Sequence, residues 1–496
     1  MKFSPALLLA VLIALGGVAA FLLPAGGSGG AETKTGLDSG AARTGTETVE
    51  DLKKQIDLLL GQNEYLQGQV DVLQEENAGL IQKLGTLGMK GVAKMEPATP
   101  GNGGIVPDFV GMGVEMMKFR KIQALPLVTT PSTPAQVEAA ILKWLRAQQP
   151  GDEAVRFARA LAALGWIPEE IDPLPLRAKM MTLQLGGWYD AETDAMLTVD
   201  PKSDPPPALK PDEPLAIAFG QLLREYGAVL FQPQHGPLST DARLARESLI
   251  VGDAGLTRFL FSLQNPTAEP GDQIPAEDPD HPLNQVPMPV YLRELSSFPF
   301  LRGFEFAQTL HSAGEFAQLN AAYSRPPVST SEVIDPEAYL DTTPPAAVEV
   351  SFPDVKLGGV EPFWDDRLGK FACVTALRAH NTDEDAALGA RGLLADRLLA
   401  WKAAEAGVKR HHAAWQTLWM DTETAEAFFK AMSNSLKQRY DAGITAGGDG
   451  DLAFAAQGRF VRLKRNRSGS EVLLIDAGSD TVRTDLHSLL DGVTKP

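Results

Sequence analysis

The residues that most often carry out chemistry in proteins are sparse in this sequence and match no common catalytic motif. Among 496 residues, 7 are His and 1 is Cys. The sequence has no H-E-x-x-H, P-loop or G-x-G-x-x-G pattern, and no His pairs with a carboxylate at ligand spacing on an expected helix face. The histidines are His235, His281, His311, His380, His411, His412 and His487. We therefore expect no metal site and no cofactor.

The single cysteine, Cys373, cannot form a disulfide within the chain. Its neighbours in the sequence are mostly apolar, and no His or orienting group lies nearby in the sequence to activate a thiolate. We predict a buried, inert thiol.

Three consecutive segments have strong local patterns. Residues 187–199 predict a β-hairpin whose turn lies at Asp190–Asp194. Residues 215–232 are almost all apolar and predict a buried helix, and residues 241–254 predict a second helix.

In this order, the segments resemble the core of a family of bacterial secreted, gluzincin-like zinc metallopeptidase domains. Members of that family carry a G-F-Y-D strand, an H-E-L-T-H-A-L-Q-D-Q-type helix and a helix with E-G-D-A. This chain has G-W-Y-D at 187–190 and V-G-D-A at 251–254. The resemblance implies a zincin-type fold of helices around a β-hairpin.

The zinc-binding motif itself is replaced. Two imidazoles at i and i+4 share one helical face and bind Zn²⁺, and the Glu between them is the general base. In the register that keeps the apolar phase, the first His corresponds to Gly220, the Glu to Gln221 and the second His to Arg224. The acidic third ligand corresponds to Val251. Gly and Val have no ligand atom, Arg repels a cation, and Gln is no general base.

Two later segments extend the resemblance, which runs from about residue 118 to 493. The family pattern F-P-Y-x-x-G-x-x-F corresponds to residues 298–306. The pattern N-A-A-Y-x-x-P-P-x-S-T-E-Q-V-x-H-P-E-x-Y corresponds to residues 320–339, where Asp335 replaces the His.

The remaining globular sequence predicts a mixed α+β fold. Helices are expected at 137–148 with Thr133 as N-cap, at 152–164, and between 176 and 187. The acidic, Pro-rich stretch 265–289 is expected to be an exposed loop. After about residue 346, strands are expected at 415–419, 459–464 and 471–475, with helices at 422–440 and 481–490.

One predicted strand carries a basic cluster in an acidic protein. The cluster is compatible with a solvated strand face and with a surface for an acidic partner. The cluster consists of Arg459, Arg462, Lys464, Arg465 and Arg467.

The N-terminus predicts export. Residues 6–23 form an uncharged, mostly apolar run that as a helix would reach about 27 Å, enough to span a bilayer. We expect segment 1–24 to be an uncleaved membrane anchor, with a cleaved signal peptide as the alternative. The bulk would then face the periplasm or the cell exterior, or be secreted if the segment is cleaved. Residues 25–47 predict a flexible linker.

Residues 48–88 predict a parallel coiled coil. Leucine occupies every d position, and β-branched residues or Asn occupy most a positions, a pattern that favours two parallel strands. The Asn residues at a fix register. The residues expected to form this homodimer are Leu52, Leu59, Asn63, Leu66, Leu73, Asn77, Leu80 and Leu87. The alternative is a lone amphipathic helix folded onto the globular part.

The amino-acid composition limits the classes of partner that the chain is expected to bind. With 45 basic and 63 acidic residues the net charge is −18, which argues against nucleic acid as a partner.

The rest of the chain is expected to divide into three segments. These are a second linker at 89–112, an inactive metallopeptidase-like domain at 113–345, and an α+β C-terminal part at 346–496.

Three functions are compatible with these patterns. The first is a non-catalytic, membrane-anchored envelope protein, a pseudopeptidase that binds peptide or protein in a persisting substrate groove. The second is a structural or scaffolding envelope protein whose coiled coil acts as a spacer. The third is an active hydrolase that uses other ligands.

Overall fold

The structure is a computed structural model, and it describes residues 109–122, 127–168, 171–200, 202–204, 207, 212–231, 238–264, 280–341, 348, 350, 358–403, 411–441, 450–466 and 469–490. The expected anchor, first linker and coiled coil lie outside these residues. Helix α3 (Phe109–Arg120) includes the last four residues of the expected second linker. Among the described helices, none has the length and apolar character needed to cross a membrane.

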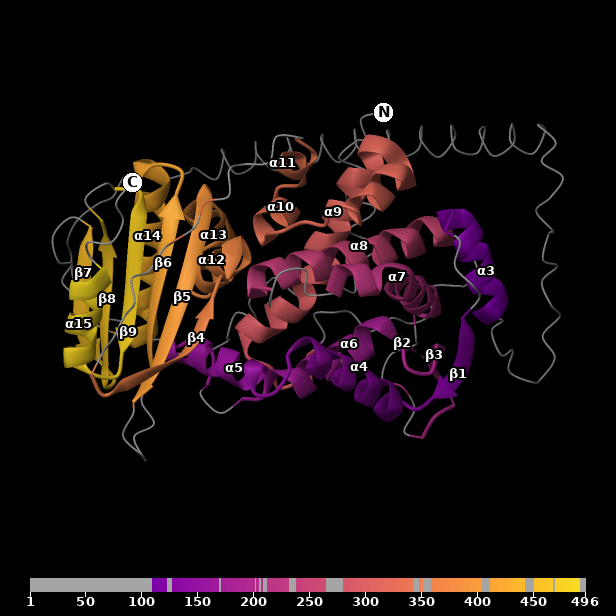
Figure 1. Cartoon of the computed structure of the whole chain (residues 1–496), viewed down its shortest axis with the longest axis horizontal. Helices are drawn as coiled ribbons and strands as arrows, with labels where there is room; N and C mark the ends of the chain where they lie inside the picture. The colour runs from indigo at the N-terminus through magenta and orange to yellow at the C-terminus, as the bar shows by residue number, and fades with distance from the viewer. Residues whose placement is uncertain are drawn as a thin grey trace, which may run out of the picture. The chain divides into compact units, whose positions relative to one another are not determined.

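The first part of the described chain is helical around a small sheet (Figure 1). After α3, its helices are α4 (Pro134–Gln148), α5 (Glu153–Ala163), α6 (Pro173–Leu185), α7 (Glu213–Phe231), α8 (Thr240–Gln264), α9 (Val290–Ala322), α10 (Thr330–Ile334) and α11 (Pro336–Leu340). Local chemistry explains several boundaries. Thr133 caps α4 in a capping box followed by Pro134, and Gly186 ends α6 in the left-handed conformation.

The small sheet has the order β1-β3-β2. Strands β2 (Gly187–Asp190) and β3 (Ala195–Val199) form the predicted antiparallel hairpin, which is confirmed. Strand β1 (Val128–Ser132) pairs with β3 in parallel and was not predicted. Pro131 within it argues against a central strand, and β1 indeed lies at the edge of the sheet.

Helices α7, α8 and α9 form the core of the helical part. Both helices predicted at 215–232 and 241–254 are confirmed as α7 and α8. The backbones of α8 and α9 approach so closely that a Cβ atom on Gly252 would overlap the carbonyl group of Gly303. Glycine at both positions therefore permits the crossing.

Helix α9 is interrupted near its C-terminal end. Gly314 and Glu315 have non-helical backbone angles, and Glu315 has φ 54° and ψ −152°. This conformation is costly for a residue with a side chain. The interruption redirects the segment that carries Phe316 and Tyr323.

The second part of the described chain is a six-stranded antiparallel sheet with the order β4-β5-β6-β9-β8-β7 (Figure 1). Its strands are β4 (Val360–Asp366), β5 (Leu393–Ala403), β6 (His411–Trp419), β7 (Asp451–Ala456), β8 (Arg459–Arg465) and β9 (Glu471–Ala477). Its helices are α12 (Gly369–Arg378), α13 (Asp383–Gly389), α14 (Thr422–Tyr440) and α15 (Asp480–Leu490). The predicted α+β class is confirmed.

Both faces of this sheet are covered, and neighbouring residues of one strand pack on opposite faces. On β6, Trp415 packs against Phe428 of α14, whereas its neighbour Ala414 belongs to a cluster with Val482 and Leu486 of α15. Trp166 joins the helical part to the sheet, because its ring stacks on Tyr291 of α9 and meets Trp415 edge-on.

Part of the expected loop 265–289 is packed rather than exposed. In its described portion, Leu283 and Val286 are buried, as is His281. Arg293 holds this segment in place, because it donates hydrogen bonds to the backbone oxygens of Leu283 and Val286. The expectation of a wholly exposed loop was therefore wrong.

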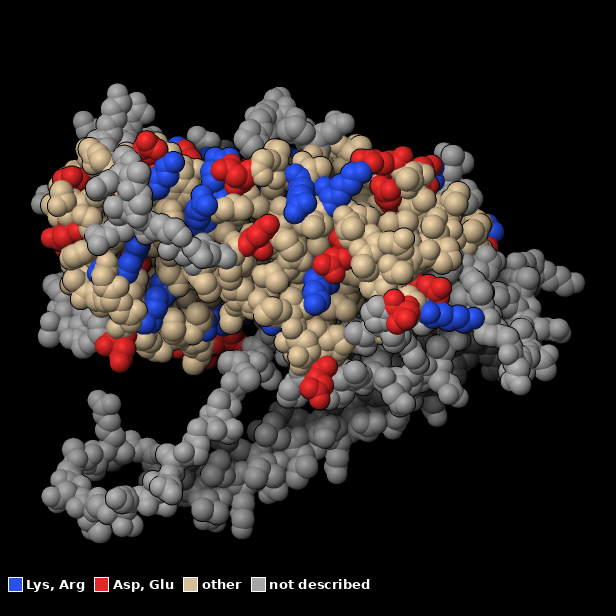
Figure 2. Space-filling view, turned by 90° about the horizontal axis from the view of Figure 1, so that it is seen from below, with Lys and Arg blue, Asp and Glu red and all other residues tan. Residues whose placement is uncertain are grey.

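Three arginines of the basic cluster, all on β8, form ion pairs within the protein. Arg459 pairs with Asp476, Arg462 with Asp451, and Arg465 with Glu426. Figure 2 shows Lys and Arg interspersed with Asp and Glu among uncharged residues on one face of the molecule. Since these three arginines have intramolecular carboxylate partners, the cluster does not require an acidic partner molecule.

Candidate functional site

The α7 position expected to match the first zinc ligand is closed by packing. A Cβ atom on Gly220 would lie 2.6 Å from Met196 Sδ on β3 and 3.3 Å from Tyr189 Cβ on β2. Glycine thus lets α7 lie directly on the hairpin. The expected substrate groove is not open at this residue.

The position of the expected general base makes a structural hydrogen bond. Gln221 is 2% exposed, and its Nε2 donates to the backbone oxygen of Gly113 on α3 at 2.6 Å. A glutamate carboxylate has no proton to donate at neutral pH and would face this oxygen with a negative charge. The amide at this position therefore holds α3 against α7.

The position of the second expected imidazole ties α7 to the hairpin turn. Arg224 Nη2 lies 2.9 Å from Asp194 Oδ2, and Tyr189 donates a hydrogen bond to the other oxygen of Asp194. Asp194 has a positive φ of 50°. The two bonds hold the turn, so Arg224 has a positioning role.

The position of the expected third ligand belongs to the core. Val251 is 1% exposed on α8 and offers no atom that binds a metal. The two residues that follow it have clear structural roles. Gly252 permits the crossing with α9, and Asp253 forms an ion pair.

That ion pair joins α3 to α8, and Tyr323 at the C-cap of α9 is hydrogen-bonded to it. Arg120 on α3 holds both carboxylate oxygens of Asp253, with Nη2 at 2.5 Å and Nε at 3.1 Å. Thr257 and Tyr323 also donate to this carboxylate, at 3.1 and 2.8 Å. Both charged side chains are almost fully buried, at 1% and 0% exposure. A buried pair with this many hydrogen bonds satisfies the carboxylate completely.

Aromatic rings surround the guanidinium. Phe316 lies over Arg120 with its ring centroid 4.4 Å away, and Tyr226 stacks on Tyr323 at 3.9 Å. Burial raises the pKa of Tyr323 well above its ordinary value, and burial likewise lowers the pKa of His311. The fixed cation of Arg120 disfavours the binding of a second cation here.

A second buried polar cluster lies at the start of α8. Asp241 accepts hydrogen bonds from the backbone N–H and hydroxyl of Thr330, at 2.7 and 2.5 Å. Asp366 at the end of β4 accepts from Thr240 in the same way, at 2.9 and 2.5 Å. Asp396 on β5 accepts from the backbone of Leu368 and Gly369 and from Trp415 Nε1, at 2.9 Å each.

Desolvation perturbs all three carboxyl groups. Burial raises the pKa of Asp241 to about 7 and that of Asp366 to about 6, and it also raises the pKa of Asp396. The nearby carboxylates raise the pKa of Asp241 further, while the bonds from Thr330 lower it. Perturbed carboxyl groups often mark functional sites, but these are buried and already hydrogen-bonded. We interpret them as a junction between the helical part and the sheet.

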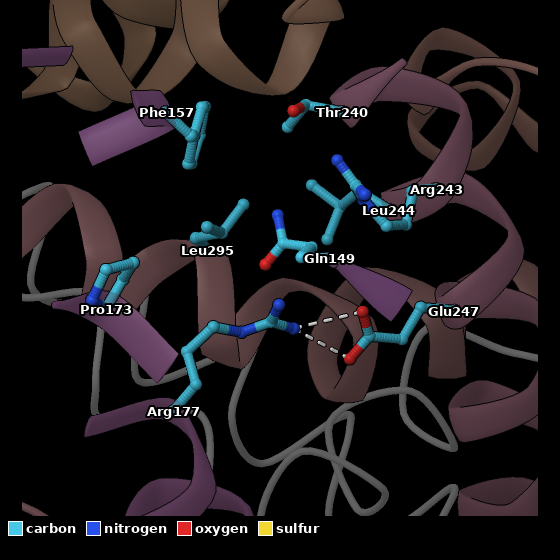
Figure 3. A pocket seen from close by; sticks show the side chains of 9 residues that line it. All are labelled: Gln149, Phe157, Pro173, Arg177, Thr240, Arg243, Leu244, Glu247 and Leu295. Carbon is cyan, nitrogen blue, oxygen red and sulfur yellow. Dashed lines mark hydrogen bonds and ion pairs between the residues drawn. The ribbon is translucent and has the colours of Figure 1, made fainter. Parts of the chain in front are cut away.

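A small enclosed pocket lies beside this junction (Figure 3). The ion pair of Arg177 and Glu247 lines one end, and Phe157 and Thr240 line the other. The accessible volume is about 20 Å³. That is room for a single water molecule, for which about 10–15 Å³ suffices. Arg177 Nε is buried without an acceptor, so a water there would satisfy it.

The sequence indicates where the four expected site residues lie in the chain but not which residues they contact. Gly220, Gln221 and Arg224 lie along α7 and join it to β3, α3 and the hairpin turn, whereas Val251 lies in α8. Arg120 and the three aspartates of the junction were not predicted. Thr240 and Asp366 are 126 residues apart in the sequence, and no local sequence pattern predicts a contact between them. The intact Gly252-Asp253 pair was the one visible signal.

In the described ranges, no group of three or more His, Cys, Asp and Glu side chains is arranged to hold a metal ion. Cys373 is fully buried, as predicted, and burial raises the pKa of its thiol well above the ordinary value. Comparison of the chain with family models, with curated proteins and with solved structures finds no match.

Proposed function

We propose that this chain is a non-catalytic binding protein that keeps a metallopeptidase-like scaffold without the chemistry of a peptidase. Its ligand would be a peptide or a protein. The expected anchor and coiled coil would present the globular part outside the cytoplasm as a membrane-bound homodimer.

One observation carries this proposal: the motif residues that persist have structural roles, and the residues that differ are those expected to bind zinc. Gly252 lets two helices cross and Asp253 anchors α3. In the hairpin, Asp190 accepts hydrogen bonds from Glu192 N and Thr193 Oγ1 and so holds the turn. A scaffold that must fold without a metal retains the residues that have structural roles and tolerates loss of the residues that would bind zinc.

The zinc content of the purified full chain tests the absence of catalysis. After equilibration with zinc and removal of free metal, we expect far less than one zinc per chain by mass spectrometry. We also expect no cleavage of casein. The variants Gln221→Ala and Arg224→Ala serve as controls, since they should lower stability and leave the zinc content unchanged. One bound zinc per chain, together with proteolysis that a chelator abolishes, would overturn the proposal.

The coiled coil predicts a dimer whose disruption is measurable. Changing Leu66 and Leu73 to Lys places charges at two d positions of the seam. We expect light scattering in detergent to show a dimer for the native chain and a monomer for this variant. A matched change at two e positions, which flank the a and d seam, Gln67→Lys and Gln74→Lys, should leave the dimer intact. A native monomer would refute dimerisation and favour a helix packed on the globular part.

A scaffolding role is the second candidate, and the packing at Gly220 favours it. Because α7 lies directly on β3 there, the expected peptide groove is not open at this point. Cross-linking from isolated envelopes separates the two candidates. A binding protein should lose its partner when a pool of short peptides is added in excess, whereas a fixed scaffold should keep it.

A further inference from the structure

An open groove lies between α13 and α14, far in sequence from the residues expected to bind zinc. Its volume is about 510 Å³. Small residues line much of it, namely Gly389 of α13 and Ala427 and Ala431 of α14. Small residues allow the backbone of another chain to approach closely, which side chains of ordinary size would prevent.

Three exposed apolar side chains lie in α13, in β5 and just before α14. Leu388, which lines the groove, is 54% exposed, Leu394 is 48% exposed and Met420 is 60% exposed. Met420 precedes the N-cap of α14 and donates its backbone N–H to Gly392, while Leu394 follows the paired Leu393 and Trp419. Of these three side chains, Leu388 lines the groove and is available to pack against an apolar side chain of a partner.

Three acidic side chains and one basic side chain, Lys430, line the groove, so its net charge is negative. Asp385 on α13 and Glu423 on α14 form no ion pair within the described part of the chain. Glu426 differs from both, since Lys430 lies 2.5 Å and Arg465 3.6 Å from its carboxylate. The two helices therefore each contribute an unpaired negative charge beside an apolar floor.

We propose that this groove binds a basic, amphipathic segment of a partner protein. Apolar side chains of the segment would pack against Leu388 and the small residues, and its Lys or Arg side chains would pair with Asp385 and Glu423. This inference deepens the proposed function and rests on it for the premise that the chain binds a protein.

Three synthetic peptides of equal length test the proposal by fluorescence anisotropy with the full chain in non-ionic detergent. The first is an amphipathic Leu/Lys peptide, the second replaces Lys by Glu, and the third scrambles the Leu/Lys order. We expect the first to bind at least about tenfold more tightly than the others, a difference in which apolar and charge complementarity both contribute.

Matched variants locate the binding. Asp385→Lys with Glu423→Lys should weaken binding of the Leu/Lys peptide by about tenfold or more. Glu337→Lys with Asp485→Lys makes the same change in net charge at exposed positions outside the groove and should change affinity less than about twofold. Equal losses in both variants would mean attraction to the acidic protein as a whole and would overturn the proposal.

A third variant keeps the charges and fills the groove. Ala427→Phe should abolish binding of the Leu/Lys peptide, and Leu388→Ser should weaken it, with circular dichroism confirming that each variant is folded. Unchanged affinity in both would overturn the proposal. The zinc measurement tests the absence of catalysis separately, so either result can fail without the other.

Discussion

Helix α8 carries buried aspartates in two different settings, one in its first turn and one in its middle. Asp253 is held by the guanidinium of Arg120 and two hydroxyl groups. Among the described residues, Asp241 has no such cation and accepts hydrogen bonds from the backbone N–H and hydroxyl of Thr330, with Asp366 and Asp396 nearby. The same residue type is therefore stabilised as an ion pair in one region and by neutral donors in the other.

The difference shows what each region does in the fold. An ion pair has a fixed geometry and joins two elements, here α3 and α8. A carboxyl group that is hydrogen-bonded by neutral donors and lies close to other carboxyl groups has a higher free-energy cost of ionisation. The stability of the fold around it therefore depends on whether the group is protonated. The first region holds the helical core together, and we expect the stability of the second, the junction with the sheet, to depend on pH.

Breaking the ion pair should have the largest effect. Asp253→Leu leaves the charge of Arg120 buried and unpaired, and we expect the free energy of unfolding to fall by about 3–5 kcal/mol. Urea denaturation followed by circular dichroism measures it. The double variant Arg120→Met/Asp253→Leu removes both charges and should regain most of this loss. A double variant as unstable as the single one would show that packing, not charge, accounts for the loss.

The junction should respond to pH in the opposite sense from most acidic groups. The pKa of Asp241 is raised from 3.8 to about 7, so between these values the folded state binds more protons than the unfolded state. The free energy of unfolding must then decrease as pH rises through this window, by roughly 2–4 kcal/mol for such a shift. Arg243 and Arg367 oppose the shift at Asp366 and Asp396 without removing it.

Denaturation midpoints from pH 4 to pH 8 test this prediction. The difference between the native chain and Asp241→Asn should be steep between pH 4 and pH 7 and flat above. Asp421→Asn is the matched control. Hydrogen bonds from Thr424 lower the pKa of Asp421, so its contribution to stability should instead be lost as pH falls. Parallel curves for the native chain and Asp241→Asn would contradict the prediction.

Gln221 is a buried polar residue whose side-chain amide donates to a backbone oxygen. Of the three changes, its replacement should lower the free energy of unfolding least. Gln221→Glu turns the donor facing the Gly113 oxygen into an acceptor, and we expect a loss of about 1–3 kcal/mol at neutral pH. The loss should shrink in acid, where a protonated carboxyl can donate again. A stability equal to that of the native chain at pH 7 would argue against this hydrogen bond.

Much of the secondary structure could be predicted because its signals are local. Helix α14 runs from Thr422 to Tyr440 as expected, and Asp421 caps it. The hairpin of β2 and β3 follows from its alternation and turn residues. Strand β1 could not be predicted in this way, because its pairing with β3 compensates for a proline that local rules disfavour.

The candidate site was predictable in position but not in environment. The register on α7 identified Gly220 and Gln221, yet nothing in the sequence indicates that Met196 packs against the first or that Gly113 accepts from the second. Likewise, Arg120 and Asp253 lie 133 residues apart. Such contacts depend on how helices cross, and a crossing depends on the packing of many side chains at once.

The sequence by itself determined the α+β class, most helices and strands, the apolar face of α7 and the absence of an H-E-x-x-H motif, because each of these is written in residues close together along the chain. Only the tertiary structure decided that Asp253 is paired while Asp241 is not, and that a groove opens between α13 and α14. Burial and the partners of a buried charge are properties of the whole folded chain, and no stretch of residues contains them alone.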